Sequence, residues 1–279
     1  MTDDDRYSLA DMSSMRCPIC GSAALELFEM VLRGSVATAL HRCSGCEFTF
    51  FPDPDWLQGS FGSQLNRLDV GAVARCESMA NLILGLLPVV KKLISDHKIL
   101  DWGGGDGLLT RMLRDRGINC YWEDPYCEER YAWPAIAKPD DTFDLVLAVE
   151  VFLHIPDPLP VLRQLLDRAD VVIFTAVRPP QDLNQDWWYL MPRTGQHVSF
   201  FPQVCCERLA RLTNSHYYSD GRFVHAFTRR PLSFTARMRI SSRTIAAVVA
   251  LVRLLVAYAR LLRHHSRSLT PVDHDTSLP

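Results

Sequence analysis

The stretch that most constrains the fold of this chain runs from Lys98 to Gly107 and reads Lys-Ile-Leu-Asp-Trp-Gly-Gly-Gly-Asp-Gly. Ile99 and Leu100 are typical of the end of a buried strand, and apolar residues at helical spacing begin at Leu108. We therefore predict a strand, a glycine turn and a helix in succession. Glycines let the backbone turn sharply and approach a ligand closely, and the following helix presents free N–H groups. The stretch is suited to holding a cofactor, but such loops occur in several nucleotide-binding folds.

Acidic residues on both sides of the glycines narrow the choice of cofactor. Asp101 precedes the glycines, and the resulting pattern Asp-x-Gly-x-Gly-x-Gly resembles motif I of the class I S-adenosylmethionine-dependent methyltransferases. Asp124, with Glu123 as second choice, closes the next predicted strand about 20 residues on, where a ribose-binding acid is expected. The resemblance implies that the acid of motif I lies near the methionine amino group and that the glycines pass under the adenosine. A tight turn in an unrelated α/β domain is the structural alternative. The cofactor-binding residues predicted in this way are Asp101, Gly103, Gly105, Gly107, Glu123, Asp124 and Glu150.

Further apolar runs predict an α/β domain around this loop. Residues 143–149 form a near-continuous apolar run, which is expected for a central parallel strand buried on both faces. Residues 169–175 predict the next strand, and residues 217–228 predict a terminal hairpin. The resemblance implies a Rossmann-like, seven-stranded methyltransferase sheet. Because the chain between Asp124 and the run at 143–149 is short and contains prolines, we expect one crossover helix to be reduced.

Two Cys-x-x-Cys pairs precede this domain, and four thiolates at such spacing complete a tetrahedral structural zinc site with no open position. Residues 24–32 and 36–42 predict a hairpin between the pairs, so the module is interpreted as a zinc ribbon. A redox pair or free thiols are the alternative, against which the duplicated motif argues. A similar module precedes the methyltransferase domain in some sugar C-methyltransferases and in a family of rRNA guanine methyltransferases. The predicted zinc ligands are Cys17, Cys20, Cys43 and Cys46.

Aromatic residues gather in the long segment that follows the strand predicted at 169–175. A loop of this length after a sheet strand is usually functional, and ligands of open α/β sheets lie beyond the carboxyl ends of the strands. Trp and Tyr rings offer flat faces that stack on a sugar or another ring. We therefore expect this segment to form the acceptor pocket, with a purely hydrophobic lid as the alternative. The predicted substrate-binding residues are Trp187, Trp188, Tyr189, Gln196 and His197.

Two histidines are candidates for the general base that methyl transfer to a hydroxyl or to an activated carbon requires. His197, in the aromatic segment, is the preferred base. His154 ends the stretch Glu150-Val-Phe-Leu-His, which resembles the family's motif after the fourth strand, and a structural role for it is an equal alternative. Tyr189 and Glu150 are fallback catalytic groups. This stretch lacks the Asn/Asp-Pro-Pro-Tyr/Phe motif of amino-group methylation and a cysteine that attacks a pyrimidine ring.

The sequence predicts four parts: a flexible leader at 1–16, the zinc ribbon at 17–58, the class I methyltransferase domain at 59–232 and a basic amphipathic helical tail at 233–279. Residues 237–265 are expected to contact an anionic membrane surface, a partner protein or their own domain. The acidic N-terminus lacks the pattern of a signal peptide, so we expect a cytoplasmic protein, with peripheral membrane attachment through the tail left open. The sequence does not indicate an oligomeric state.

The leading hypothesis is an S-adenosylmethionine-dependent methyltransferase that acts on a carbohydrate or other small molecule, by O- or C-methylation, in polysaccharide or secondary-metabolite synthesis. The formal net charge of −2 offers no general attraction for nucleic acid. Residues 17–51 contain only Arg33 and Arg42 as basic residues besides His41, which disfavours an rRNA methyltransferase that grips RNA with its ribbon. A non-catalytic, cofactor-binding scaffold that recruits partners through the tail is a further hypothesis. A nicotinamide dehydrogenase is disfavoured by the glycine pattern.

Overall fold

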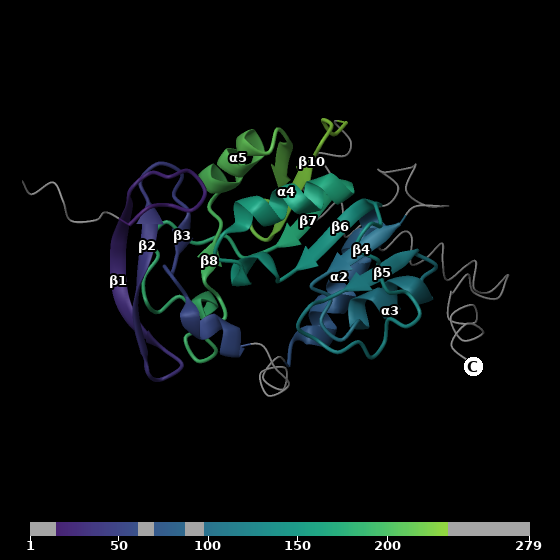
Figure 1. The fold of residues 1–279 in the computed structure, drawn as a ribbon, viewed down its shortest axis with the longest axis horizontal. Helices are drawn as coiled ribbons and strands as arrows, with labels where there is room; N and C mark the ends of the chain where they lie inside the picture. Colours follow the sequence, from purple (N-terminus) through teal and green to yellow (C-terminus); the bar gives the residue numbers. More distant parts are fainter. Residues whose placement is uncertain (1–14, 61–69, 87–97, 234–279) are drawn as a thin grey trace, which may run out of the picture.

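A six-stranded sheet forms the centre of the computed structural model, which describes residues 15–60, 70–86 and 98–233 (Figure 1). The strand order is β5-β4-β6-β7-β10-β9, in which β5, β4, β6 and β7 are parallel and the last two strands are antiparallel to their neighbours. This confirms the expected α/β class and the terminal hairpin. The strands are β4 (Ile99–Trp102), β5 (Cys120–Glu123), β6 (Phe143–Val149), β7 (Ala169–Thr175), β9 (His216–Ser219) and β10 (Val224–Thr228).

Helices cover both faces of this sheet because successive strand residues point to opposite sides. On β6, Leu145 and Leu147 pack with apolar residues of α2 and α3, whereas Val146 and Ala148 pack with those of α4 and α5. β6 is therefore buried on both faces, as its near-continuous apolar sequence predicts. The helices are α2 (Ala72–Leu86), α3 (Leu108–Asp115), α4 (Pro158–Arg168) and α5 (Gln203–Leu212).

The prediction of seven strands was wrong by one strand. Between β5 and β6 the chain forms no helix and no full strand, and only Ile136 makes an isolated parallel bridge, to Trp122 at the free edge of the sheet. Pro134 and Pro139 flank this bridge, and proline cannot donate a ladder hydrogen bond. A single bridged pair of residues thus stands where the seventh strand was expected. The crossover helix, which we expected to be reduced, is absent from this segment.

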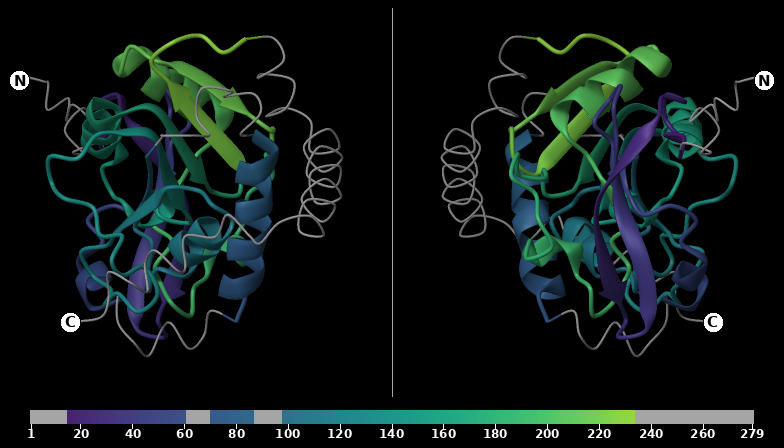
Figure 2. Two further views of the ribbon diagram at one scale, coloured as in Figure 1. Left: turned by 90° about the vertical axis from the view of Figure 1, so that its right-hand side faces the viewer. Right: turned by 90° about the vertical axis from the view of Figure 1, so that its left-hand side faces the viewer.

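The N-terminal residues form a second sheet, of order β1-β2-β3-β8, along one side of the molecule (Figures 1 and 2). β1 (Ala24–Leu32) and β2 (Val36–Cys43) form the predicted hairpin, and β3 (Thr49–Phe50) continues it. The fourth strand, β8 (Ser199–Phe200), comes from the segment after β7. The ribbon predicted at 17–58 therefore shares a sheet and an apolar core with the methyltransferase part of the chain.

The tail predicted as an amphipathic helix, including residues 237–265, lies outside the described residues, as does most of the predicted leader. Among the residues that are described, no helix is both long and apolar enough to cross a membrane.

Candidate active site

The glycine loop joins β4 to α3 in a conformation that depends on its glycines. Gly107 has a φ of 89°, and a Cβ added to it would lie 2.8 Å from the Cβ of Ala132. Gly105 has a φ of 58°, and nothing lies within 4 Å of the place that its Cβ would take. Side chains at such φ values are strained. The loop thus packs closely on Ala132, whereas its turn at Gly105 borders open space, as a cradle for a ligand requires.

Asp101 lies at the end of β4 and is almost completely buried, with 1% of its surface exposed. Thr110, in the first turns of α3, donates a hydrogen bond of 3.0 Å from Oγ1 to Oδ2 of this carboxylate. Burial raises the pKa of Asp101 to about 7, against the opposing effect of the Thr110 hydrogen bonds and with a further contribution from the charge of Asp124. The carboxylate therefore ties β4 to the helix that follows the glycines.

The raised pKa of Asp101 predicts a pH dependence of stability. The pKa of Asp101 in the folded protein lies above its value of about 3.9 in the unfolded chain. Protonated Asp101 therefore contributes fully to the free energy of unfolding below about pH 4, and this contribution is lost as the pH rises through about 7. Asp101→Asn should therefore flatten the dependence of melting temperature on pH between about 4 and 7. Thermal unfolding across this range, with the exposed Asp140→Asn as control, tests it. Parallel curves for wild type and Asp101→Asn would refute the assignment.

Of the two acids after β5, only Asp124 faces the glycine loop. Its Oδ2 accepts a hydrogen bond of 2.9 Å from the Gly105 amide, and its Oδ1 accepts bonds from the amides of Tyr126 and Cys127. The Glu123 carboxylate instead pairs with Arg168 of α4, at 2.8 Å. The backbone of Glu123 still contributes, because its carbonyl accepts a bond from the Gly103 amide at 2.8 Å. The geometry thus favours Asp124 over Glu123 as the ribose-binding acid.

Next to the glycine loop, the end of β6 brings together two of the candidate polar residues, Glu150 and Tyr189, with Thr175. Glu150 has a φ of 57°, and its carboxylate accepts hydrogen bonds from Thr175 Oγ1 at 3.0 Å and from the Tyr189 hydroxyl at 2.7 Å. Burial, followed by the charge of Glu150, raises the pKa of Tyr189 far above its usual value, so Tyr189 is a hydrogen-bond donor and not a base. A Cβ on Gly103 would lie 2.6 Å from Cγ2 of Val151, so this polar group adjoins the glycine loop.

The two candidate histidines lie beside this polar group, with their rings 5.4 Å apart in an edge-to-face contact. Nδ1 of His197 bonds to the Tyr189 carbonyl at 2.7 Å, and Nδ1 of His154 bonds to the Gln196 carbonyl at 2.8 Å. Because a carbonyl oxygen only accepts, each Nδ1 carries the proton. Burial lowers the pKa of both rings, and the neighbouring His154 contributes to a value of about 3 for His197. Both histidines are therefore neutral at physiological pH.

The two histidines differ in what else they contact. The backbone carbonyls of Gln196 and Glu150 both act on the pKa of His154, which therefore joins two loops. Among the described residues, His197 has one hydrogen bond, through Nδ1, and like His154 it is partly buried. Its Nε2 lone pair is thus the better placed to accept a proton, and the preference for His197 over His154 stays a prediction.

The other predicted substrate-binding residues divide between exposed and packed positions. Trp188 exposes 66% of its surface, whereas Tyr189 exposes 3%. Trp187 packs on Tyr189 and Phe200, with ring centroids 5.4 and 5.3 Å away. Gln196 contributes its backbone carbonyl to His154. The aromatic segment is therefore partly a lid, as the alternative interpretation held, and leaves Trp188 as the ring that is open to a ligand.

The comparison with protein families decides the class of this chain. The model described as a methyltransferase domain matches residues 75–214, which are half of the chain. The chain belongs to this methyltransferase family. The prediction of a class I S-adenosylmethionine-dependent methyltransferase is thereby confirmed, and the parallel sheet with its antiparallel hairpin agrees with it. Among curated proteins, none matches the chain.

Several solved methyltransferase structures are similar in fold to this methyltransferase. Magnesium protoporphyrin IX methyltransferase (ChlM) from Synechocystis PCC 6803 with bound SAM is 13% identical, with a TM-score of 0.41, over 63% of this chain and 89% of that chain. Mitomycin 7-O-methyltransferase MmcR is 13% identical, with a TM-score of 0.37, over 53% of each chain. The bifunctional kinase-methyltransferase WbdD is 17% identical, with a TM-score of 0.37, over 55% of this chain but only 40% of its own length. Similarity at this level carries no argument about the acceptor.

The residues of the methyltransferase loop fit the cofactor of the family. The space beside Gly105 is open, Asp124 lies at its edge, and the buried Asp101 places a carboxyl group beneath it. Sequence reasoning missed Thr110 and Thr175, which hold the two carboxyl groups of Asp101 and Glu150. In the sequence they appear only as threonines among the apolar residues of a helix or a strand. Threonines at such positions are also common in protein cores that have no site.

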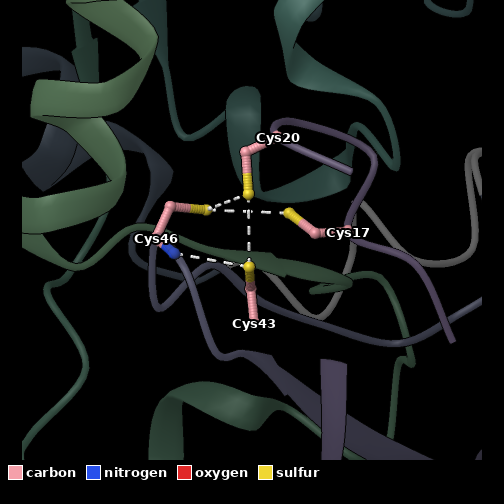
Figure 3. Close-up of side chains that lie close together, drawn as sticks. All are labelled: Cys17, Cys20, Cys43 and Cys46. Carbon is pink, nitrogen blue, oxygen red and sulfur yellow. Dashed lines mark hydrogen bonds between the residues drawn. The ribbon is translucent and has the colours of Figure 1, made fainter. Parts of the chain in front are cut away.

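The four cysteines of the predicted zinc site lie together, all sulfur atoms within 4.8 Å of one another (Figure 3). Cys17 and Cys46 have sulfurs 3.6 Å apart, and those of Cys20 and Cys43 are 3.4 Å apart. Tetrahedral zinc with Zn–S bonds of about 2.3 Å separates its sulfurs by about 3.8 Å. The amides of Gly45 and Cys46 also donate to the Cys43 sulfur, as a thiolate favours. The donor set therefore fits a closed, structural zinc site.

Proposed function

We propose that this enzyme methylates a hydroxyl group of a carbohydrate or another small molecule, with His197 as general base. The observation that carries this proposal is the position of the Glu150, Tyr189 and His197 group, which adjoins the glycine loop through Val151. Bound S-adenosylmethionine supplies the electrophilic methyl group, and the acceptor oxygen must displace it in line. Holding the acceptor at attack distance accounts for about 7–11 kcal/mol of such a barrier, so positioning is the main task of the protein.

The polar group next to the glycine loop is arranged to orient a hydroxylated acceptor. The Glu150 carboxylate already accepts bonds from Thr175 and Tyr189, which fix its direction. The Tyr189 carbonyl in turn fixes the ring of His197, so that Nε2 remains to receive the proton. Trp188 offers an exposed ring face against which a sugar or a flat ring stacks. In this role the chain's own residues bind and orient the acceptor and take up one proton.

The low pKa of His197 favours oxygen over carbon as the methylated atom. A neutral imidazole with a pKa of about 3 is a weak base and does not remove a proton from carbon readily. A hydroxyl oxygen becomes strongly acidic as it bonds to the methyl group, so a weak base placed beside it is sufficient. We therefore infer O-methylation. The four cysteines hold the ribbon together and take no part in this step, because four thiolates leave zinc no open position.

The same pKa predicts the shape of the pH–rate profile. Because burial lowers the pKa of His197 to about 3, the ring is already neutral across about pH 5 to 8. The value of kcat should therefore be flat in this range and fall only in more acidic solution, where the ring gains a proton. Steady-state rates in buffers of constant ionic strength measure it. A rise of kcat with a midpoint near the usual histidine pKa of about 6.5 would contradict the assignment.

The acceptor class is tested by transfer of a labelled methyl group to a panel of acceptors. Full-length, zinc-loaded enzyme is incubated with labelled S-adenosylmethionine and nucleotide sugars, glycosides, phenols or rRNA. Label on an oxygen of a small hydroxylated acceptor, located by NMR and mass spectrometry, supports the proposal. Label on RNA alone, or on a carbon atom, would replace it with the corresponding alternative. Binding of S-adenosylhomocysteine without transfer to any acceptor would favour the non-catalytic scaffold.

A further inference from the structure

Residues 192–201, which contain His197, follow the zinc ribbon along their whole length. The side chain of Trp56 donates a hydrogen bond of 2.8 Å from Nε1 to the Gly195 carbonyl, although the two residues are 139 positions apart in sequence. The Arg33 amide, at the tip of the ribbon hairpin, donates to the Pro192 carbonyl at 2.8 Å. At the other end, β8 pairs with β3, which places Phe200 opposite Thr49 (Figure 1). These contacts attach the segment to the ribbon at both ends and near its middle.

The opposite edge of the same segment carries the candidate catalytic group. Val198 donates its amide to Leu153 at 2.8 Å, while its carbonyl accepts from the Phe51 amide of the ribbon at 3.0 Å. Ser199 Oγ donates to the Ile155 carbonyl at 2.6 Å. The segment therefore lies between the ribbon on one side and the stretch that contains His154 on the other.

Gly195 shows how closely the turn fits the ribbon. Its φ is 63°, and a Cβ added to it would lie 3.0 Å from Cγ of Arg33 and 3.2 Å from Nε1 of Trp56. The ring of Trp56 makes an edge-on contact with the ring of Phe51, with ring centroids 6.3 Å apart. The Trp56 carbonyl also accepts a hydrogen bond from Arg33 Nη1 at 3.0 Å. Trp56 is therefore a rigid donor aimed at the turn that precedes His197.

The ordering of this segment has to come from outside it. Between β7 and α5 the chain forms only a short 3-10 turn at Trp188–Leu190 and the two-residue β8. A long loop with so little structure of its own loses much conformational entropy when it is fixed. The ribbon in turn gains order from its metal, because a hairpin contributes little stability by itself and bound zinc would hold the four cysteines of its two turns together. Bound zinc would therefore order the ribbon, and the ordered ribbon would in turn order the loop.

The packing of α3 and β5, which flank the glycine loop, does not depend on the ribbon in this way. Leu109 and Leu113 of α3 and Cys120 of β5 pack in a second core cluster, which contains no ribbon residue. The ribbon cysteines, by contrast, share a larger cluster with Phe200 and Leu190 of the acceptor side, which also reaches Leu100 of β4. Loss of ribbon order therefore affects the acceptor loop first.

The geometry points to the zinc ribbon as the support of the acceptor loop, with Trp56 as the positioning residue that fixes the turn before His197. The zinc thereby governs the order of residues 192–201 and leaves the glycine loop unaffected. Only the consequence for turnover rests on the proposed function, since the ordering of the loop is measurable without any acceptor.

The test of the zinc effect is amide hydrogen exchange on the full-length protein, compared between the zinc-loaded wild type and Cys43→Ser, with calorimetric titration of S-adenosylhomocysteine beside it. We expect peptides that cover 192–201 to exchange at least about tenfold faster in Cys43→Ser, while peptides of α3 and β5 and the affinity for S-adenosylhomocysteine stay unchanged. Equal protection of 192–201 in both proteins overturns the proposal. So does an equal loss of protection in α3 and β5, because zinc would then support the whole fold.

Trp56→Phe tests the positioning role without disturbing the metal, because it keeps an aromatic ring for the contact with Phe51 while it removes the indole N–H donor. The chemically matched control is Trp133→Phe, at an exposed tryptophan remote from the ribbon contacts. Trp56→Phe should speed exchange at 192–201 and raise the acceptor KM by about 3- to 10-fold, with kcat much less changed, as the loss of one hydrogen bond predicts. Unchanged exchange at 192–201 overturns the role of Trp56. If no acceptor is methylated but exchange changes as expected, only the proposed function fails.

Discussion

Replacement of His197 by Ala is expected to lower kcat by about 10²–10⁴-fold, the usual contribution of a positioned general base. The affinity for S-adenosylhomocysteine should not change, because the ring contacts Tyr189 and His154 and no residue of the glycine loop. Both histidines have a fixed Nδ1–H bond, but the Glu150 carbonyl also acts on His154, whereas His197 has no second hydrogen bond among the described residues. The measurement is single-turnover methyl transfer with saturating acceptor, beside calorimetric titration of the cofactor product.

A parallel His154→Ala variant separates catalysis from support. His154 joins the carbonyls of Gln196 and Glu150, so its loss should loosen the loop and raise the acceptor KM as well as lower kcat. The His197→Ala defect should instead lie mainly in kcat. If His197→Ala keeps nearly full kcat while His154→Ala loses it, the two roles are exchanged and the preference drawn from the hydrogen-bond partners of the two rings is wrong.

The features that the sequence predicted well are those encoded by neighbouring residues. The strand, the glycine turn and the helix from Ile99 to Asp115 follow from local spacing, and the paired cysteines predict their own cluster because each pair lies in one tight turn. The burial of β6 on both faces likewise follows from its own near-continuous run of apolar residues. Features of this kind can be predicted from neighbouring residues alone, without the remainder of the fold.

The features that the sequence did not predict depend on partners that are distant in the chain. β8 has two residues, and nothing in Ser199 or Phe200 indicates that they complete a sheet begun by Thr49. The missing seventh strand was assumed from the family, although the prolines around Ile136 favoured its reduction. The pairing of Glu123 with Arg168, which removes this acid from the glycine loop, also joins residues whose spacing carries no pattern.

This last contact leads to the second large effect that we expect, at the cofactor site. Asp124→Ala should raise the dissociation constant of S-adenosylhomocysteine by about 10- to 150-fold, which corresponds to the loss of about 1.5–3 kcal/mol from hydrogen bonds to a charged group. The reason is twofold. We predict that the carboxylate binds the ribose, and it also accepts bonds from the amides of Gly105, Tyr126 and Cys127, which shape the loop.

Glu123→Gln is the matched control, because it neutralises the adjacent acid. Its carboxylate pairs with Arg168, and an ion pair that is partly open to solvent contributes at most about 1 kcal/mol to stability. The affinity for S-adenosylhomocysteine should therefore stay at the wild-type value, as calorimetry would show. A reversed result, with affinity lost in Glu123→Gln and kept in Asp124→Ala, would mean that the Arg168 pair breaks when the cofactor binds and that Glu123 is the ribose acid. Since Asp124 reaches Gly105 without any rearrangement, whereas Glu123 must first leave Arg168, the physical cost favours Asp124.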